Sequence, residues 1–133
     1  MEKRQYQREV INCIGLFYIQ GGEYGKIEFD GVVTDISENG MAIKIVEPKC
    51  IMIADEVQVG TELKFCFIDK YEIFRETKNV DITGIATVVR KDKNADRLII
   101  GCTFRGDRRK IEQYVSDKKM ITFMSVYISK SNI

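Results

Sequence analysis

The sequence predicts a mainly β protein: a small antiparallel β-barrel followed by a C-terminal helix. Two observations carry this prediction. Short runs rich in Ile, Val, Phe and Thr recur between turns up to residue 104, and a helical period replaces them afterwards. Many short antiparallel strands at such spacing are typical of a small barrel or closed sandwich. At 133 residues the chain fits a single domain with a core of its own.

Six strands are expected, and each is a run of β-branched and aromatic residues bounded by turn residues. The expected strands are 10–19, 26–36, 41–46, 62–68, 80–90 and 98–104. In the last of them apolar residues occupy every second position, which is the period of a strand with one face in the core. Turns are predicted at Gly21-Gly22, at Asn39-Gly40 and over 91–96.

Two stretches, 47–59 and 69–79, read as excursions from the barrel, although Tyr71, Ile73 and Phe74 could extend the hairpin in the second. A helix is expected over 106–128, since apolar residues then recur three or four positions apart and Gly106-Asp107 supplies a start. Beyond residue 120, β-branched residues leave the helical prediction ambiguous.

Two interpretations of the C-terminal segment stay open. It covers one mouth or face of the barrel, or it forms a surface for a partner or for a homodimer. The second is suggested by more apolar area than a terminal helix on a small barrel usually buries. The residues concerned are Met120, Phe123, Met124, Tyr127 and Ile128.

Composition argues against an enzyme. The chain has no histidine, the commonest general base, and its four cysteines show no paired spacing for a metal. No P-loop or nucleophile elbow is present, so no catalytic or metal-binding residue is assigned. The polar start and the widely spaced cysteines suggest a cytoplasmic protein, and no apolar stretch is long enough to predict a membrane span. A net charge of +1 disfavours a DNA or RNA partner.

Two short motifs carry the functional prediction. Arg4 and Arg8 lie on a polar N-terminal arm, residues 1–9, while Asp35, Ser37 and Gly40 lie at a strand end. Guanidinium groups bind the O6/N7 edge of guanine bidentately, and a carboxylate accepts N–H bonds from a base. The motifs together predict a site for a guanine-containing ligand with two negative charges.

The strand period places Asp35 and Ser37 on one face, and the cost of burying a carboxylate predicts that this face is the outer one. Gly40 is then expected to adopt a positive φ in the following turn. A purely structural interpretation remains open, because Asp, Ser and Asn-Gly are also ordinary turn residues.

The ordered pair R-x-x-x-R and D-x-S-x-x-G resembles the PilZ domain family, bacterial receptors for cyclic dimeric GMP (c-di-GMP). The resemblance covers roughly residues 4–116 and includes Gly101 and Phe104 in the last strand. It implies a split-barrel type of fold for 10–104. It also implies that Arg4 and Arg8 bind guanine edges and phosphates, that Asp35 and Ser37 hold a guanine and nearby ligand oxygens, and that Gly40 admits close backbone approach. Lys3, before the first arginine, favours two intercalated ligands.

The resemblance thus implies a receptor that takes c-di-GMP as a ligand and no cofactor. Binding is expected to order the N-terminal arm and to switch contact with an unidentified downstream protein in motility, exopolysaccharide or virulence control. The main alternative is an adaptor with the same fold that binds proteins and no nucleotide. A barrel that binds single-stranded nucleic acid is the less favoured alternative, since such proteins use a basic groove.

Overall fold

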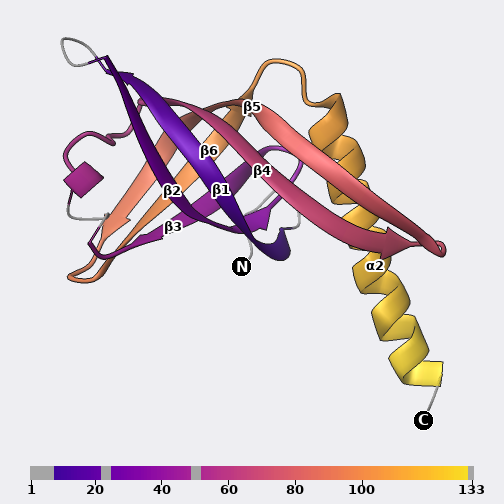
Figure 1. The fold of residues 1–133 in the computed structure, drawn as a ribbon. Helices are drawn as coiled ribbons and strands as arrows, with labels where there is room; N and C mark the ends of the chain where they lie inside the picture. The colour runs from indigo at the N-terminus through magenta and orange to yellow at the C-terminus, as the bar shows by residue number, and fades with distance from the viewer. Residues whose placement is uncertain (1–7, 22–24, 49–51, 132–133) are drawn as a thin grey trace.

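Six antiparallel strands close into a barrel, and a long helix follows them (Figure 1). This computed structural model describes residues 8–21, 25–48 and 52–131. The strands are β1 (Glu9–Gly21), β2 (Gly25–Ile36), β3 (Gly40–Val46), β4 (Glu62–Ile73), β5 (Glu76–Lys93) and β6 (Arg97–Arg105), and the helix is α2 (Arg109–Ser131). Their order around the ring is β1-β2-β3-β6-β5-β4, and β4 pairs with β1 to close it. The predicted fold class is confirmed.

The core follows from the two-residue period of the strands. Along β4, Leu63, Phe65 and Phe67 point inward and are at most 2% exposed, while the residues between them face outward. The aromatic rings of the core contact one another, as at Phe65 and Phe104, whose centroids lie 5.6 Å apart. A ring closed by main-chain pairing on both sides of every strand leaves the outer wall as a firm platform for side chains.

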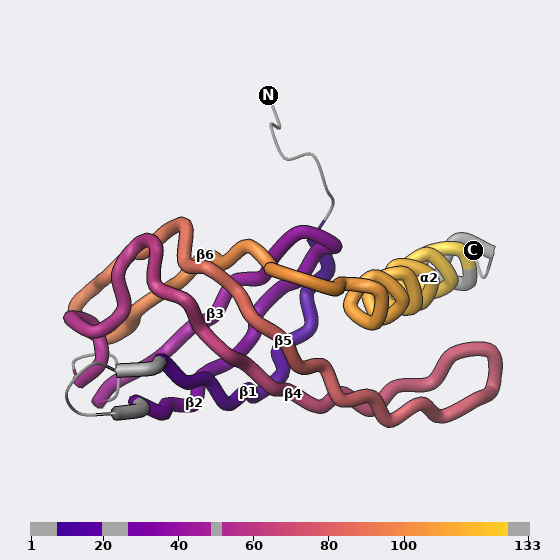
Figure 2. The backbone as a smooth tube through the Cα atoms, turned by 90° about the horizontal axis from the view of Figure 1, so that it is seen from above, coloured from indigo at the N-terminus to yellow at the C-terminus, as the bar shows by residue number. Residues whose placement is uncertain are grey.

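The stretch 69–79 is not an excursion but the continuation of the β4–β5 hairpin, whose pairing runs to Ile73 and Glu76. Figure 2 shows this hairpin reaching beyond the barrel beside α2. Tyr71 and Ile73 maintain the alternation and are each 8% exposed. The 47–59 stretch does leave the sheet as predicted, and its Val57 is fully buried in the core.

Helix α2 begins three residues later than expected. Gly106 has a φ of +76°, so it ends the strand in a left-handed turn, and an Asp107 carboxylate oxygen accepts the Arg109 N–H at 3.0 Å. The first half of the helix packs on the barrel through Ile111, Tyr114 and Val115, each at most 3% exposed. The ambiguous segment beyond residue 120 is helical through Ser131.

A buried carboxylate anchors α2 to the hairpin. Asp117 is 6% exposed and accepts hydrogen bonds from Tyr71 Oη at 2.7 Å, Lys78 Nζ at 2.9 Å and Gln113 Nε2 at 3.0 Å. Burial raises the pKa of Asp117, but these donors outweigh it and hold the pKa below its usual value. The same contact and burial raise the pKa of Tyr71 above its usual value.

A second tyrosine–aspartate pair runs in the opposite direction. Tyr114 Oη on α2 donates to Asp69 Oδ2 on β4 at 2.7 Å, and Lys118 Nζ donates to the same oxygen at 3.1 Å. Each element therefore supplies one tyrosine and one aspartate to the other. We call these two contacts the reciprocal pairs, and they fix where α2 lies along the hairpin.

Within the described residues, no helix combines the length and apolar character that a membrane crossing requires.

Because the folded-state pKa of Asp117 is depressed, its stabilising effect is present above the unfolded value near 3.8 and is lost as the pH falls below it. Replacing Asp117 with Asn should lower the free energy of unfolding at pH 7 by about 1–3 kcal/mol, since the buried donors lose a charged acceptor. The difference between wild type and Asp117→Asn should shrink as the pH falls below about 4. Urea unfolding at several pH values measures this.

The control is Asp81→Asn, because Asp81 is exposed on β5. Its unfolding free energy should track that of the wild type across the pH range. A gap between wild type and Asp117→Asn that stays constant from pH 7 to about pH 2 would show that the charge of Asp117 does not stabilise the helix.

Candidate functional site

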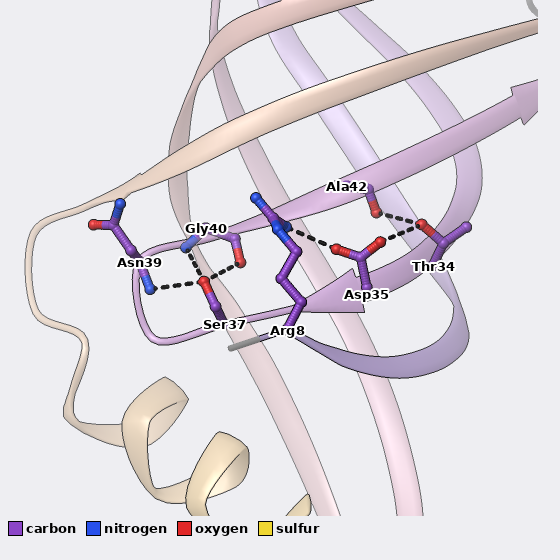
Figure 3. Close-up of polar contacts among 7 residues, drawn as sticks. All are labelled: Arg8, Thr34, Asp35, Ser37, Asn39, Gly40 and Ala42. Atoms are coloured by element: carbon purple, nitrogen blue, oxygen red, sulfur yellow. Dashed lines mark hydrogen bonds and ion pairs between the residues drawn. The ribbon is translucent and has the colours of Figure 1, made fainter. Parts of the chain in front are cut away.

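Pairing between β1 and β2 brings the two sequence motifs together. The strands are antiparallel, with Glu9 opposite Ile36 and Val10 opposite Asp35, so the start of β1 lies beside the end of β2. Arg8 immediately precedes β1, and its Nη1 donates to Asp35 Oδ1 at 2.7 Å (Figure 3). Residues 27 positions apart thus meet on the barrel wall.

A β-bulge turns Asp35 toward Arg8. Val33 and Ile36 are both fully buried, which strict alternation does not allow for residues three apart. The register between β2 and β3 shifts between Val33 and Asp35, so Thr34 is an extra residue there. The extra residue re-aims the strand, and Asp35 leaves the core with 26% of its side chain exposed.

Asp35 is oriented from two sides. Arg8 binds one carboxylate oxygen, and Thr34 Oγ1 lies 3.3 Å from the other and 3.4 Å from the Ala42 carbonyl oxygen. The Arg8 side chain is 25% exposed, so the ion pair is partly withdrawn from water and is reachable from solvent. Such a site offers a planar cation and an anion side by side, which can pair with the donor and acceptor edges of a base.

Ser37 does not lie on the outer wall beside Asp35, so that prediction is wrong. It is 3% exposed, and its Oγ accepts the N–H groups of Asn39 and Gly40, each at 3.2 Å. The strand ends at Ile36, so the two-residue period no longer applies at Ser37. The hydroxyl instead completes the turn from Ser37 to Gly40, which we call the motif turn (Figure 3).

Gly40 is required for close approach and not for a positive φ, which corrects a second expectation. Its φ lies outside the left-handed region. A Cβ atom at this position would lie 2.1 Å from the carbonyl oxygen of Cys102 on β6. Gly40 pairs with Thr103 in the β3–β6 ladder, so only a residue without a side chain lets the two backbones meet here.

Helix α2 contacts the motif turn, which sequence reasoning missed. Lys119 Nζ donates to Glu38 Oε1 at 2.5 Å. Burial raises the pKa of Glu38, but the hydrogen bond and charge of Lys119 hold it below its usual value. Within the described part of the chain, the other oxygen of Glu38 is buried with no hydrogen-bond partner. The two residues are 81 positions apart, and no local pattern links them.

Two further contacts connect α2 and the residue before it to the motif turn and to β1. Arg108, just before α2, donates from Nη1 to Asn39 Oδ1 at 3.1 Å. Thr122 Oγ1 on α2 donates to Glu9 Oε2 at 3.2 Å, and Glu9 directly follows Arg8. The helix and the residue before it therefore touch residues adjacent to both motifs.

Arg4 and Lys3, together with the arm up to residue 7, lie outside the described residues. Among the described residues, no three carboxylates or cysteines form a group that could hold a metal ion. Cys13 and Cys102 are buried free thiols, and burial raises the pKa of Cys102 to about 12. Cys66 is partly exposed.

Replacing Gly40 with Ala should destabilise the barrel by about 2 kcal/mol or more, because the new methyl group overlaps backbone that cannot move aside. Gly101→Ala is a matched control on β6: there the nearest atoms are 3.4 Å away, in the flexible Arg90 side chain. Its unfolding free energy should change by less than about 1 kcal/mol. Chemical denaturation compares the two, and equal stabilities would contradict the assigned role of Gly40.

Comparison with known proteins places this geometry in a family. The model of the PilZ domain matches residues 2–117. Three solved structures are similar in fold. The inhibitor of motility MotI/DgrA of Bacillus subtilis is 15% identical with a TM-score of 0.59, over 96% of this chain and 53% of that one. MrkH of K. pneumonia, in complex with c-di-GMP, is 16% identical with a TM-score of 0.64, over 90% and 53%.

The PilZ domain of YcgR from Escherichia coli, with c-di-GMP, is 12% identical with a TM-score of 0.51, over 98% of both chains. The chain spans about half the length of the MotI and MrkH chains. No curated protein sequence matches it. At these identities the solved structures support only the fold. The family model covers both motifs and all six strands, and it identifies the family. The chain belongs to the PilZ domain family.

Proposed function

We propose that this chain is a c-di-GMP receptor that binds its ligand on the barrel wall at Arg8 and Asp35, with Arg4 as the second cation of the arm. The proposal rests on one observation above the others: the two motifs meet in a solvent-reachable Arg8–Asp35 pair at 2.7 Å. Ligand binding then switches contact with a downstream protein in the bacterial cytoplasm.

Arg8 and Asp35 suit the ligand chemically. A guanidinium group can bind guanine O6 and N7 or stack on its ring, and a carboxylate can accept from the N1 and N2 hydrogens. The two ligand phosphates carry two negative charges, which Arg4 and Arg8 can neutralise. With a formal net charge of +1, the protein as a whole attracts an anionic ligand little, so Arg4 and Arg8 must supply the attraction. Lys3, next to Arg4, favours two intercalated ligands over one.

Ser37 and Gly40 act as positioning residues in this proposal. The Ser37 hydroxyl already serves the backbone of the motif turn, and Gly40 presses that turn against β6. Both therefore keep the end of β2, and with it Asp35, at a fixed place on the wall. The ion pair with Arg8 holds the Asp35 carboxylate in position before the ligand arrives, which reduces the reorganisation that binding requires.

The contacts of α2 connect the proposed ligand site to the helix. Glu9 follows Arg8 and bonds to Thr122, while Glu38 follows Ser37 and bonds to Lys119. A ligand that draws Arg8 away from Asp35 or shifts the motif turn changes the partners of the helix at the same time. The downstream protein would then respond to how α2 is seated, together with the ordering of the arm.

An adaptor with the PilZ fold that binds no nucleotide is the alternative. One observation favours this alternative: Arg8 and Asp35 already form an ion pair with each other, as they would if their role were purely structural. A calorimetric titration of the full chain with c-di-GMP separates the two, because an adaptor gives no binding heat.

In that titration, Arg8→Ala should weaken binding by about tenfold to a hundredfold, the loss of one bidentate contact of about 1–3 kcal/mol. The double variant Arg4→Ala/Arg8→Ala should show no measurable binding. Arg97→Ala is the matched control. Arg97 is exposed and opposite Val46, at the end of β3 away from Gly40, and its loss should leave affinity unchanged. Wild-type affinity in the double variant would rule out this site.

The route through α2 predicts that c-di-GMP changes amide hydrogen exchange along the helix in the wild type. Lys119→Gln should bind the ligand but show a smaller change in α2, because its link to Glu38 is gone. Lys110→Gln, an exposed position on the same helix, should respond like the wild type. The route is wrong if the two variants show the same exchange difference on ligand addition.

A further inference from the structure

The C-terminal half of α2 extends away from the barrel (Figure 1). From Thr122 to Tyr127 every side chain is exposed, in contrast to the buried residues of the first half. The ten residues from Thr122 to Ser131 correspond to about 15 Å of helix. The segment continues the anchored first half of a 23-residue helix, so it needs no nucleation of its own, but the β-branched Thr122 and Val126 lower its helical propensity. A packing partner on its exposed side chains would stabilise it.

The exposed surface of this half is apolar. Residues 120–129 include no charged residue, although 31% of the chain is charged. Phe123 is 63% exposed, Tyr127 62%, and Met120 and Met124 40% each. These four residues, which we call the α2 stripe, are spaced three and four apart and share one face of the helix. The rings of Phe123 and Tyr127 stack with centroids 6.5 Å apart.

The tip of the β4–β5 hairpin continues this apolar surface. A cleft of about 550 Å³ lies between the tip, residues 72–75, and the helix at Met120, Ile121, Met124 and Ser125. Phe74 at the tip is 71% exposed. Phe74 and Arg75 have φ values of 51° and 65°, a conformation that Asn-Gly adopts easily and that costs other residues about 1–2 kcal/mol each. An exposed phenylalanine in such a turn does not serve the stability of the monomer.

We propose that a second copy of this chain covers the surface, with the two α2 helices packed antiparallel through their stripes. The stripe carries no charge, so its partner must be apolar and uncharged, and another stripe meets both conditions. The exposed rings of Phe123 and Tyr127 would form the centre of a two-fold contact, where aromatic residues contribute most to binding.

The available area is sufficient for a specific dimer. Phe74, Val126 and the α2 stripe together expose on the order of 600 Å² per copy, given the size of such side chains. Two copies would bury about 1,200 Å², at the lower end of the range for specific interfaces. The inference does not depend on ligand binding, since none of these residues belongs to the Arg8–Asp35 site.

Analytical ultracentrifugation over a concentration series tests this proposal. The wild type should reach twice its monomer mass at tens of micromolar, and Phe123→Glu/Tyr127→Glu should dissociate at least about a hundredfold more readily. Ile14→Glu is the control, since Ile14 is 74% exposed and lines a pocket with residues of β2 and β3 and none of α2. It should dimerise like the wild type. Circular dichroism checks that each variant is folded.

A second variant tests the dimer without destabilising the monomer. Phe74→Asn/Arg75→Gly gives the hairpin a favoured turn, so it should raise the melting temperature of the monomer while weakening the dimer. A wild type that stays monomeric at several hundred micromolar would overturn the proposal and leave the surface to a different protein. Dimers that survive both the helix and the hairpin variants would overturn it as well.

Discussion

The structure depends on an irregularity in β2. Thr34 is one residue too many for the ladder with β3, and this surplus lets Val33 and Ile36 both enter the core while Asp35 points outward. The β1–β2 ladder is also irregular at this level, where Asn12 has a φ of 52°. Without the bulge, strict alternation would bury Asp35 beside Val33, at the cost of an unpaired carboxylate. Asp35 can contact Arg8 because the bulge at Thr34 turns its side chain out of the core.

The barrel and the helix are held by different kinds of force. Every strand pairs with two neighbours through its main chain, so the wall that carries Asp35 cannot deform without breaking several ladder bonds. Among the described residues, helix α2 is attached to the barrel through side-chain contacts: apolar contacts at Ile111 and Val115, and the polar contacts to the hairpin and the motif turn. The seating of the helix is therefore easier to alter than the wall of the barrel.

The sequence was sufficient for the order of the strands along the chain and for the barrel class, which follow from the two-residue period and the turn residues. It predicted that the two motifs share one ligand site, but not that Arg8 and Asp35 pair directly. Gly40 was misjudged because its environment is tertiary: the carbonyl of Cys102 approaches from a strand 62 residues further along the chain. Ser37 was misjudged because the strand period stops at Ile36, and its hydroxyl bonds within its own turn. The bulge at Thr34 and the link from Lys119 to Glu38 left no local trace, since neither changes the pattern of apolar residues.

The reciprocal pairs have a mechanical consequence. Tyr71 to Asp117 and Tyr114 to Asp69 cross between hairpin and helix in opposite directions, so sliding α2 by one turn would break both. A tilt about them keeps both tyrosine–aspartate bonds but changes the Lys119–Glu38 and Thr122–Glu9 contacts, so the pairs act as a pivot near residue 116. The helix extends about seven residues before that point and about fifteen after it, so a rigid tilt moves the Ser131 end roughly twice as far as the Arg109 end. Helix α2 is thus built as a lever that enlarges small displacements.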